Sequence, residues 1–256
     1  MEFYETSKKG ELMKTGIIIL NYNSADDTTK YVNKIKDYKV LDKIVVVDNL
    51  SAETDCMGKL NKLKSDKVHV IQAEKNGGYS YGNNFGIKYL QSLNEKFDYI
   101  IISNPDVDVS EEAIKTCLDF LKDNSKAAVC APRMIDSNQN PVRRSSWRIR
   151  KPLIDMVNST RLTEILFWWA LKKGEYKAQD YEKPELKVEA VSGAFFVIKY
   201  DVFEKCGFFD EETFLFYEED ILASKIEKLG YEEYSINDIS FTHFESQTIG
   251  KVYSYF

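Results

Sequence analysis

Nearly continuous apolar runs of four or five residues alternate with longer segments of helical character through the first half of the chain. Such short runs are typical of strands that are buried on both faces of a sheet. The runs lie at 16–20, 43–47, 68–71, 99–102 and 127–130, and the helical segments lie at 25–37, 53–64, 79–92 and 110–123. Strands that alternate with helices predict an α/β protein with a mostly parallel sheet flanked by helices on both faces.

The second half departs from this alternation. Residues 143–187 form an insert rich in basic and aromatic side chains, and a core-like strand returns at 188–198. A last helix is expected to end at Gly230, because glycine readily takes the left-handed conformation that terminates helices. We expect a single domain over residues 1–256 that includes this insert and a polar N-terminal extension at 1–13.

The composition narrows the class of protein. A hydrophobic share of 43% and an aromatic share of 13% indicate a folded chain, and the net charge of −6 argues against a nucleic acid partner. The four cysteines lack the spacing of a zinc site or a disulfide framework. The first residues are too polar for a signal peptide, and no apolar run approaches the ~20 residues that span a bilayer. We therefore expect a cytoplasmic protein with reduced thiols.

Polar side chains follow three of the predicted strands. Asn21-Tyr22-Asn23 ends the first strand, Asp48-Asn49 ends the second, and 104–108 (Asn-Pro-Asp-Val-Asp) ends the fourth. Ligands of open parallel sheets bind outside the carboxyl ends of the strands, so these side chains predict a site. The first strand is followed by neither a G-x-G-x-x-G motif nor a Walker loop, which argues against NAD binding and a P-loop ATPase.

The acids at these strand ends suit a nucleoside diphosphate. Asp48 can accept the N3–H of a uracil or thymine ring, and Tyr22 can flank that ring. Asp106 and Asp108 are two residues apart, which in an extended chain places both carboxylates on one side. There they can hold a divalent cation, Mg²⁺ or Mn²⁺, that neutralises a diphosphate leaving group. Each of these acids taken alone is also an ordinary turn or cap residue.

Two further clusters have candidate roles. Gly77 and Gly78 precede a predicted helix, where glycine lets the backbone approach a ligand and free N–H groups bind anions. The same glycines could instead only turn the chain. Glu218, Glu219 and Asp220 follow an aromatic run, and one of them could be a general base toward a sugar hydroxyl. Acids in a first helical turn are also common for stability alone.

Taken together, the motifs resemble the family 2 glycosyltransferases of GT-A fold, particularly the rhamnosyltransferase-like branch of bacterial polysaccharide biosynthesis. The resemblance covers roughly residues 15–245, and the motifs occur in the family's order. It implies a Rossmann-like sheet. The matching segments are 17–23, 45–49, 76–86, 104–106, 191–194 and the acidic run at 218–220.

The resemblance also implies roles for individual residues. It implies nucleotide binding by Asn21, Tyr22, Asn23, Asp48, Asn49, Asn76, Gly78, Tyr79, Asn83 and Asn104. It implies metal binding by Asp106, with Asp108 as the weaker candidate. His243 resembles a late family histidine near the diphosphate or the metal, and the alternative is an ordinary surface histidine. It implies contact with the donor or acceptor sugar by Ser192, Gly193 and Trp147. The family's catalytic base falls on Glu219 when residues are counted back from Gly230, and on Asp220 when residue types are matched.

The implied activity is inverting transfer of a sugar from a nucleotide diphosphate sugar, such as dTDP-rhamnose or a UDP-sugar. The acceptor would be a glycan or a lipid-linked glycan. One alternative is a sugar-phosphate nucleotidyltransferase, which needs a glycine-rich basic loop after the first strand, whereas 21–27 is acidic. Another alternative is a non-catalytic subunit that binds sugar nucleotides, against which the intact acids argue.

The insert has a distinctive charge. Residues 143–173 contain eight basic and two acidic side chains, a balance of +6, so the rest of the chain carries −12. Phe167, Trp168 and Trp169 lie among them. Aromatic beside basic residues suit the headgroup region of an anionic leaflet, so we expect this segment to contact the acceptor or, peripherally, the inner face of the cell membrane. The alternative is packing of these aromatics on the domain or on a second subunit of a homodimer.

Overall fold

The computed structural model describes residues 13–142, 145–149 and 176–244 of the 256-residue chain. The predicted N-terminal extension lies almost entirely outside these residues. So does most of the 143–187 insert, including Phe167, Trp168 and Trp169. The membrane contact and the homodimer therefore stay predictions. Within the described ranges, no helix combines the length and the apolar character needed to cross a membrane.

The first half of the chain alternates strands with helices, as predicted. The strands are β1 (Thr15–Asn21), β2 (Lys43–Asp48), β3 (Val68–Gln72), β4 (Tyr99–Ser103), β5 (Val107–Asp108) and β6 (Ala127–Ile135). The helices are α1 (Ala25–Ile35), α2 (Cys56–Asn61), α3 (Gly78–Ser92) and α4 (Glu111–Asp123). Ser110 caps α4 by accepting a hydrogen bond from Ala113 N at 3.1 Å. Helix α2 begins later than expected, after Asp55 in a left-handed conformation (φ 57°).

The second half holds shorter elements. Its strands are β7 (Ser146–Trp147), β8 (Glu185–Val188), β9 (Ala190–Val191), β10 (Phe195–Lys199) and β11 (Glu232–His243). Its helices are the 3₁₀ helix η2 (Ala178–Glu182), α8 (Tyr200–Lys205) and α9 (Glu218–Lys228). The single strand predicted at 188–198 is wrong, because a turn at Gly193–Ala194 separates β9 from β10. All four cysteines are free thiols.

The main sheet has the strand order β3-β2-β1-β4-β10-β6-β11-β5, with β8 paired to β11. Strands β3, β2, β1 and β4 are mutually parallel, which confirms the α/β prediction. Strand β10 then enters antiparallel between β4 and β6. Strands β7 and β9 form a separate two-stranded ribbon that pairs Ser146 with Val191. The parallel strands β3, β2, β1 and β4 therefore all end at one edge of the sheet. The turn that follows β9 meets this edge, because Ala194 accepts a hydrogen bond from Asn104, directly after β4.

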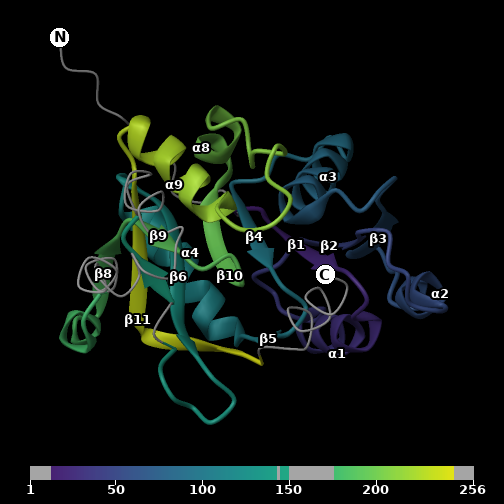
Figure 1. Ribbon diagram of the computed structural model, residues 1–256, viewed down its shortest axis with the longest axis horizontal. Helices are drawn as coiled ribbons and strands as arrows, with labels where there is room; N and C mark the ends of the chain where they lie inside the picture. The colour runs from purple at the N-terminus through teal and green to yellow at the C-terminus, as the bar shows by residue number, and fades with distance from the viewer. Residues whose placement is uncertain (1–12, 143–144, 150–175, 245–256) are drawn as a thin grey trace, which may run out of the picture.

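The core lies in two layers, one on each face of the sheet. Ile17, Ile19 and their neighbours pack with α1, α2 and α4, whereas Ile18 and Val45 pack with α3, α8 and α9. The helices can be followed on the two sides of the sheet in Figure 1. Because successive strand side chains point to opposite faces, two covered faces require continuous apolar runs. This is the pattern that the sequence shows.

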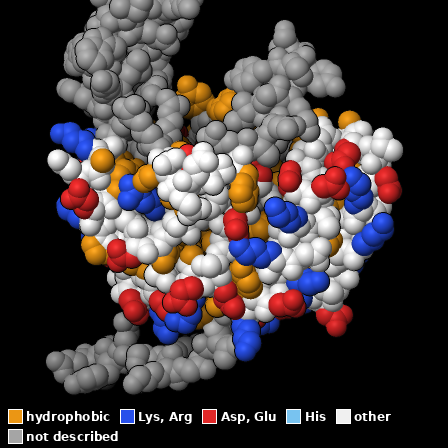
Figure 2. All heavy atoms as spheres, turned by 90° about the horizontal axis from the view of Figure 1, so that it is seen from below, with side chains coloured by type: hydrophobic (Ala, Val, Ile, Leu, Met, Phe, Trp, Pro, Cys, Tyr) orange, Lys and Arg blue, Asp and Glu red, His pale blue; other side chains and the backbone are white. Residues whose placement is uncertain are grey.

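The surface is mixed in charge on the face drawn in Figure 2. Acidic and basic side chains are interspersed there, and apolar side chains occur in small separate areas. Such a surface is ordinary for a folded protein and does not by itself mark a binding site.

Candidate functional site

The ends of β1 and β2 meet in a network of polar side chains. Asn21 and Asp48 are register partners, and Asn21 Nδ2 donates to Asp48 Oδ1 at 2.9 Å. Asp48 also accepts hydrogen bonds from both polar groups of Ser51 and, at 2.9 Å, from Gln72 Nε2. Burial opposes ionisation of Asp48, yet these hydrogen bonds hold its pKa below the usual value. The carboxylate is therefore ionised at neutral pH.

Asp48 has no exposed surface. Both of its oxygens accept hydrogen bonds within the protein, so a nucleobase would have to displace one of these donors, of which Gln72 is exposed. Tyr22 lies beside the network and is partly buried. Asn23 takes a left-handed conformation (φ 53°), and its side-chain oxygen accepts from the N–H groups of Ala52 and Glu53. Asn23 thereby holds the loop after β2 against the end of β1.

A second set of amides joins β2 to the start of α3. Asn49 Nδ2 donates to Asn76 Oδ1 at 3.0 Å and to the Gly78 carbonyl at 3.1 Å. Gly78 has φ +85°, and a Cβ built there would lie 1.9 Å from the Phe214 carbonyl oxygen, so only glycine fits. Among the described residues, the side-chain oxygens of Asn49 and Asn83 are buried without a hydrogen-bond partner. A buried acceptor without a protein donor is a position that a water molecule or a ligand can complete.

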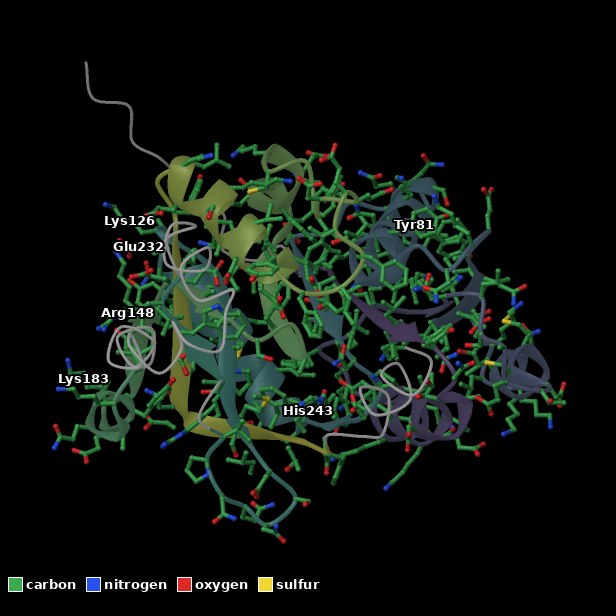
Figure 3. All side chains as sticks on the ribbon, in the orientation of Figure 1. Tyr81, Lys126, Arg148, Lys183, Glu232 and His243 are labelled. Carbon is green, nitrogen blue, oxygen red and sulfur yellow. The ribbon has the colours of Figure 1, made fainter. Side chains whose placement is uncertain are left out.

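The segment after β4 lies next to this network. Asn104 N donates to the Ala194 carbonyl at 2.8 Å, which ties the end of β4 to the turn before β10. Asp106 Oδ2 lies 3.3 Å from His243 Nε2, and the two side chains are only 10% and 18% exposed. His243 stands at the end of β11, beside β5 (Figure 3). The predicted neighbourhood of Asp106 and His243 is therefore present.

Asp108 does not join them in this structure, and its role as a metal ligand stays a prediction. Its carboxylate pairs with Lys34 of α1. The expectation assumed an extended chain, but the backbone bends at Pro105 and Asp106, so two-residue spacing no longer places both acids on one side. No group of three or more His, Cys, Asp or Glu residues suited to a metal is found in the described part of the chain.

The remaining pair still fits a divalent cation. One carboxylate and one imidazole are ligands that Mn²⁺ accepts, whereas Mg²⁺ prefers oxygen. A protein site with only two ligands leaves coordination positions for diphosphate oxygens and water, as is usual for cations that act on phosphates. Asp106 and His243 are thus the residues of this chain that would hold such a cation.

Four acids gather on the other side of the turn before β10. Glu218, Glu219 and Asp220 form the first turn of α9, and Glu233 lies on β11. Glu219 Oε1 accepts from Gly193 N at 3.0 Å, and Asp220 Oδ1 accepts from Trp147 Nε1 at 2.6 Å. The hydroxyl of Tyr79 donates to the Gly193 carbonyl at 2.7 Å. These contacts bring the predicted base candidates to the turn that touches Asn104.

Gly193 is the point of closest approach. A Cβ at this position would lie 2.6 Å from Glu219 Oε1 and 2.9 Å from the Tyr79 hydroxyl, so any other residue must displace one of them. Ser192 is partly buried beside it, and Ser192 Oγ accepts from Ala194 N at 3.3 Å. The predicted sugar-contacting residues Ser192, Gly193 and Trp147 therefore all border the acidic cluster.

Burial raises the pKa of the clustered acids. It raises the pKa of Glu218 to about 7, with the Glu219 charge adding to the effect, and it raises the pKa of Glu219 as well. Burial raises the pKa of Glu233 to about 8. Our sequence analysis missed Glu233, because β11 was not predicted. The alternation of polar and apolar residues around Tyr234 and Ile236 was the signal that could have revealed the strand.

Glu233→Gln is expected to weaken the pH dependence of stability. The ordinary pKa of this carboxyl is 4.5, and in the folded protein it rises to about 8, mainly by burial and further by the charges of Glu219 and Asp220. Between these values the folded chain binds more protons than the unfolded chain, so its free energy of unfolding falls as pH rises. Gln keeps an oxygen that can accept from Val191 N, as Glu233 does at 3.1 Å.

The measurement is the melting temperature of both proteins at about pH 5 and about pH 8. The variant should match the wild type at the lower pH and exceed it at the higher one. Other groups contribute to the pH dependence of wild-type stability. The pKa of Glu218 is raised in the same direction, and the charge of Glu233 contributes to raising the pKa of the Cys206 thiol. If the variant and the wild type melted at the same temperature at the higher pH as well as at the lower one, the assignment of a neutral, buried Glu233 would be contradicted.

The sequence is similar to a known protein family and to a curated protein. Residues 16–207 match the model of the family described as glycosyl transferase family 2. The low-salt glycan biosynthesis hexosyltransferase Agl10 of Haloferax volcanii is 30% identical over 205 residues, which are 79% of this chain and 58% of the relative. The chain thus spans little more than half the length of this curated relative.

Solved structures with bound nucleotides share the fold. GalNAc-T7 with UDP, GalNAc and Mn²⁺ has a TM-score of 0.67 at 14% identity, over 91% of this chain and 43% of that one. The mannosyltransferase PcManGT of Pyrobaculum calidifontis with GDP-Man and Mn²⁺ has a TM-score of 0.61 at 14% identity, over 92% of this chain and 58% of that one. S. aureus TarS with UDP-GlcNAc has a TM-score of 0.63 at 16% identity, over 91% of this chain and 59% of that one. At these identities the likeness concerns the arrangement of the elements, not the substrates.

Proposed function

Because the chain belongs to glycosyl transferase family 2 and has the GT-A fold, we propose that it transfers a sugar from a nucleoside diphosphate sugar to a hydroxyl group of a glycan or lipid-linked acceptor. The observation that carries this proposal is a run of contacts along the sheet edge. Asn104 N bonds the Ala194 carbonyl, and Gly193 N bonds Glu219. Residues suited to a nucleotide, to a diphosphate and to a base thus share one site.

The nucleotide side is supported by the amide network of β1, β2 and α3. Its buried acceptors on Asn49 and Asn83 suit the donors of a nucleoside or a sugar. A uridine or thymidine diphosphate sugar, dTDP-rhamnose included, has the ring N3–H that Asp48 could accept. Two of the similar structures hold UDP or UDP-GlcNAc and one holds GDP-Man, so the base of the donor is the part of this proposal that needs a direct test.

The diphosphate side is supported by Asp106 and His243. A divalent cation held there supplies positive charge that stabilises the leaving nucleoside diphosphate. Both side chains are largely buried and within 3.3 Å of each other, so they are preorganised for one shared ligand. Mn²⁺ accompanies the nucleotide in two of the similar structures.

The base is assigned to Glu219 rather than to Asp220. One oxygen of Glu219 is fixed by Gly193 N, and burial raises its pKa toward the value that suits a base at neutral pH. Asp220 instead accepts from the Trp147 ring at 2.6 Å, which gives it a positioning role. Glu219 would remove the proton of the acceptor hydroxyl as its oxygen bonds the anomeric carbon and the bond to the diphosphate breaks. A single displacement of this kind inverts the configuration.

A screen of nucleotide sugars tests the proposal. The protein is mixed in turn with UDP-, dTDP- and GDP-sugars in the presence of Mn²⁺ or Mg²⁺, and its melting temperature is measured. A ligand at 100 times its Kd adds about 2.7 kcal/mol of stability, so the correct donor should give a clear rise. The same donor should then release its nucleoside diphosphate when acceptors are supplied. If no nucleotide sugar raises the melting temperature, the proposed function fails; if one does without turnover, the chain is a non-catalytic binding subunit.

A further inference from the structure

Four consecutive apolar side chains face solvent directly before α9. We call Phe214, Leu215, Phe216 and Tyr217 the apolar strip; their exposed fractions are 57%, 39%, 49% and 58%. Folded proteins expose single apolar side chains freely, but a contiguous set of large ones typically marks a binding surface. Elsewhere among the described residues, the exposed large apolar side chains are isolated: Leu50, Leu229 and Phe244.

The backbone holds the strip outward in a costly conformation. Phe216 and Tyr217 both have positive φ, 72° and 69°, a left-handed conformation that side chains other than glycine rarely adopt. The strip is anchored at both ends: the Phe214 carbonyl accepts from Tyr79 N at 3.1 Å, and the Tyr217 carbonyl accepts from Ile221 N at 2.9 Å. Strain that the surrounding structure maintains is found mainly at functional sites.

The strip connects the two halves of the proposed active site. At its first residue it contacts the start of α3, where Gly78 leaves room for the Phe214 carbonyl. At its last residue it leads into Glu218 and Glu219. The loop between α8 and α9 that carries it can be followed to the start of α3 in Figure 1. A molecule bound on the strip therefore lies next to Glu219.

The local charge limits what this molecule can be. Residues 207–224 contain six acids, against which the nearby lysines are Lys88, paired with Glu211 at 3.3 Å, and Lys225, so the balance is acidic. A phosphate group or an anionic bilayer would be repelled here, because clustered carboxylates disfavour a second negative charge. A neutral partner with an apolar face and hydroxyl groups meets no such penalty.

We propose that the apolar strip is the acceptor subsite and binds the C–H face of a neutral sugar ring. This inference rests on the proposed function, and it names the substrate class of that same site. A pyranose ring has an apolar face that aromatic side chains cover favourably, whereas its hydroxyl groups remain free at the rim. Held on the strip, the ring presents a hydroxyl to Glu219, and its weakly polar face shields the strip from water.

Saturation-transfer NMR with methyl glycosides of neutral hexoses and 6-deoxyhexoses tests the binding without any donor. The wild type should transfer saturation to the ring C–H protons of at least one glycoside. The double variant Phe214→Ser/Phe216→Ser should bind that glycoside about ten-fold more weakly, since aromatic contacts of this kind contribute on the order of that factor. The matched control is Leu229→Ser, which removes another exposed apolar side chain at the far end of α9.

The kinetics of sugar transfer provide a second test of the strip. In transfer assays, the double variant should raise the KM for the glycoside acceptor about ten-fold, with a smaller change in kcat. The rise in melting temperature with the nucleotide sugar should persist in this variant, which shows that the fold and the donor site are intact. The single variant Phe214→Tyr should bind the glycoside as the wild type does, because tyrosine keeps the aromatic face.

The outcomes separate this inference from the proposed function. Unchanged glycoside binding in the double variant, or no saturation transfer in the wild type, overturns the subsite. Flotation of the wild type, but not of the double variant, with neutral phosphatidylcholine vesicles also overturns it, since the strip would then bind lipid. If no nucleotide sugar binds at all, the proposed function fails, whereas the NMR result still decides whether the strip binds sugars.

Discussion

Asp106→Asn should lose sugar transfer by roughly 100-fold or more, because charge stabilisation by a bound cation contributes several kcal/mol to such reactions. Asn keeps the shape and one oxygen of the side chain but removes the negative charge that holds a divalent cation. Asp106 lies on the bent segment after β4 and outside the hydrophobic core, so the fold should survive, and the melting temperature without ligand checks this. Transfer rate and the Mn²⁺-dependent rise in melting temperature are the measurements.

Asp108→Asn is the matched control. It lies two residues away on the same segment, but its carboxylate pairs with Lys34 at a position where both side chains are 43% exposed. Exposed ion pairs contribute little, so this variant should retain transfer close to that of the wild type. Full activity of Asp106→Asn, or of the wild type in excess EDTA, would show that no cation at Asp106 is needed. Equal losses in both variants would show that the segment matters only for structure.

Glu219→Gln should reduce transfer by about 10²–10⁴-fold while donor binding persists, because it removes the proton acceptor. The amide oxygen of Gln can still accept from Gly193 N, as Glu219 Oε1 does at 3.0 Å, so the turn before β10 should keep its position. Asp220→Asn should be mild, since an amide oxygen can still accept from Trp147 Nε1. The measurements are transfer rate and the donor-dependent melting temperature for each variant.

The pH dependence provides a second readout. Burial raises the pKa of Glu219, and a base acts only when ionised, so the wild-type transfer rate should rise with pH through that pKa. The small residual rate of Glu219→Gln should lose this dependence. A reversed pattern, with Asp220→Asn nearly inactive and Glu219→Gln mild, would move the base to Asp220. Near wild-type rates in both variants would place it elsewhere.

Local sequence determined the frame of the site. The apolar runs at 16–20, 43–47 and 99–102 require strands covered on both faces, and such strands in an α/β chain run parallel. Parallel strands end at one edge, which is why Asn21 and Asp48 could be placed together before the structure was known, and they are register partners. The roles of these residues in binding a nucleotide, and the candidates for the metal ligand and the base, came from the order of the family motifs.

Bends and breaks within an element could not be predicted in this way. The two-residue spacing of Asp106 and Asp108 indicates one side only if the chain is extended, and the bend at Pro105 removes that condition. The apolar stretch at 188–198 reads as one strand, yet a turn divides it at Gly193. In both places a local pattern is compatible with two backbone paths, and packing against distant segments selects one of them.

The proposed choice of Glu219 as the base and the observed burial of Glu233 both rest on tertiary contacts. Tyr79 and Gly193 are 114 residues apart in sequence, and Val191 and Glu233 are 42 apart, yet both pairs are hydrogen bonded. Hydrophobic periodicity reports which side of its own element a residue faces, so it carries no information about such partners. The pKa of a carboxyl depends on burial and neighbouring charges. Glu219 meets the turn before β10 through the hydrogen bond from Gly193 N, and Glu233 meets β9 through the hydrogen bond from Val191 N.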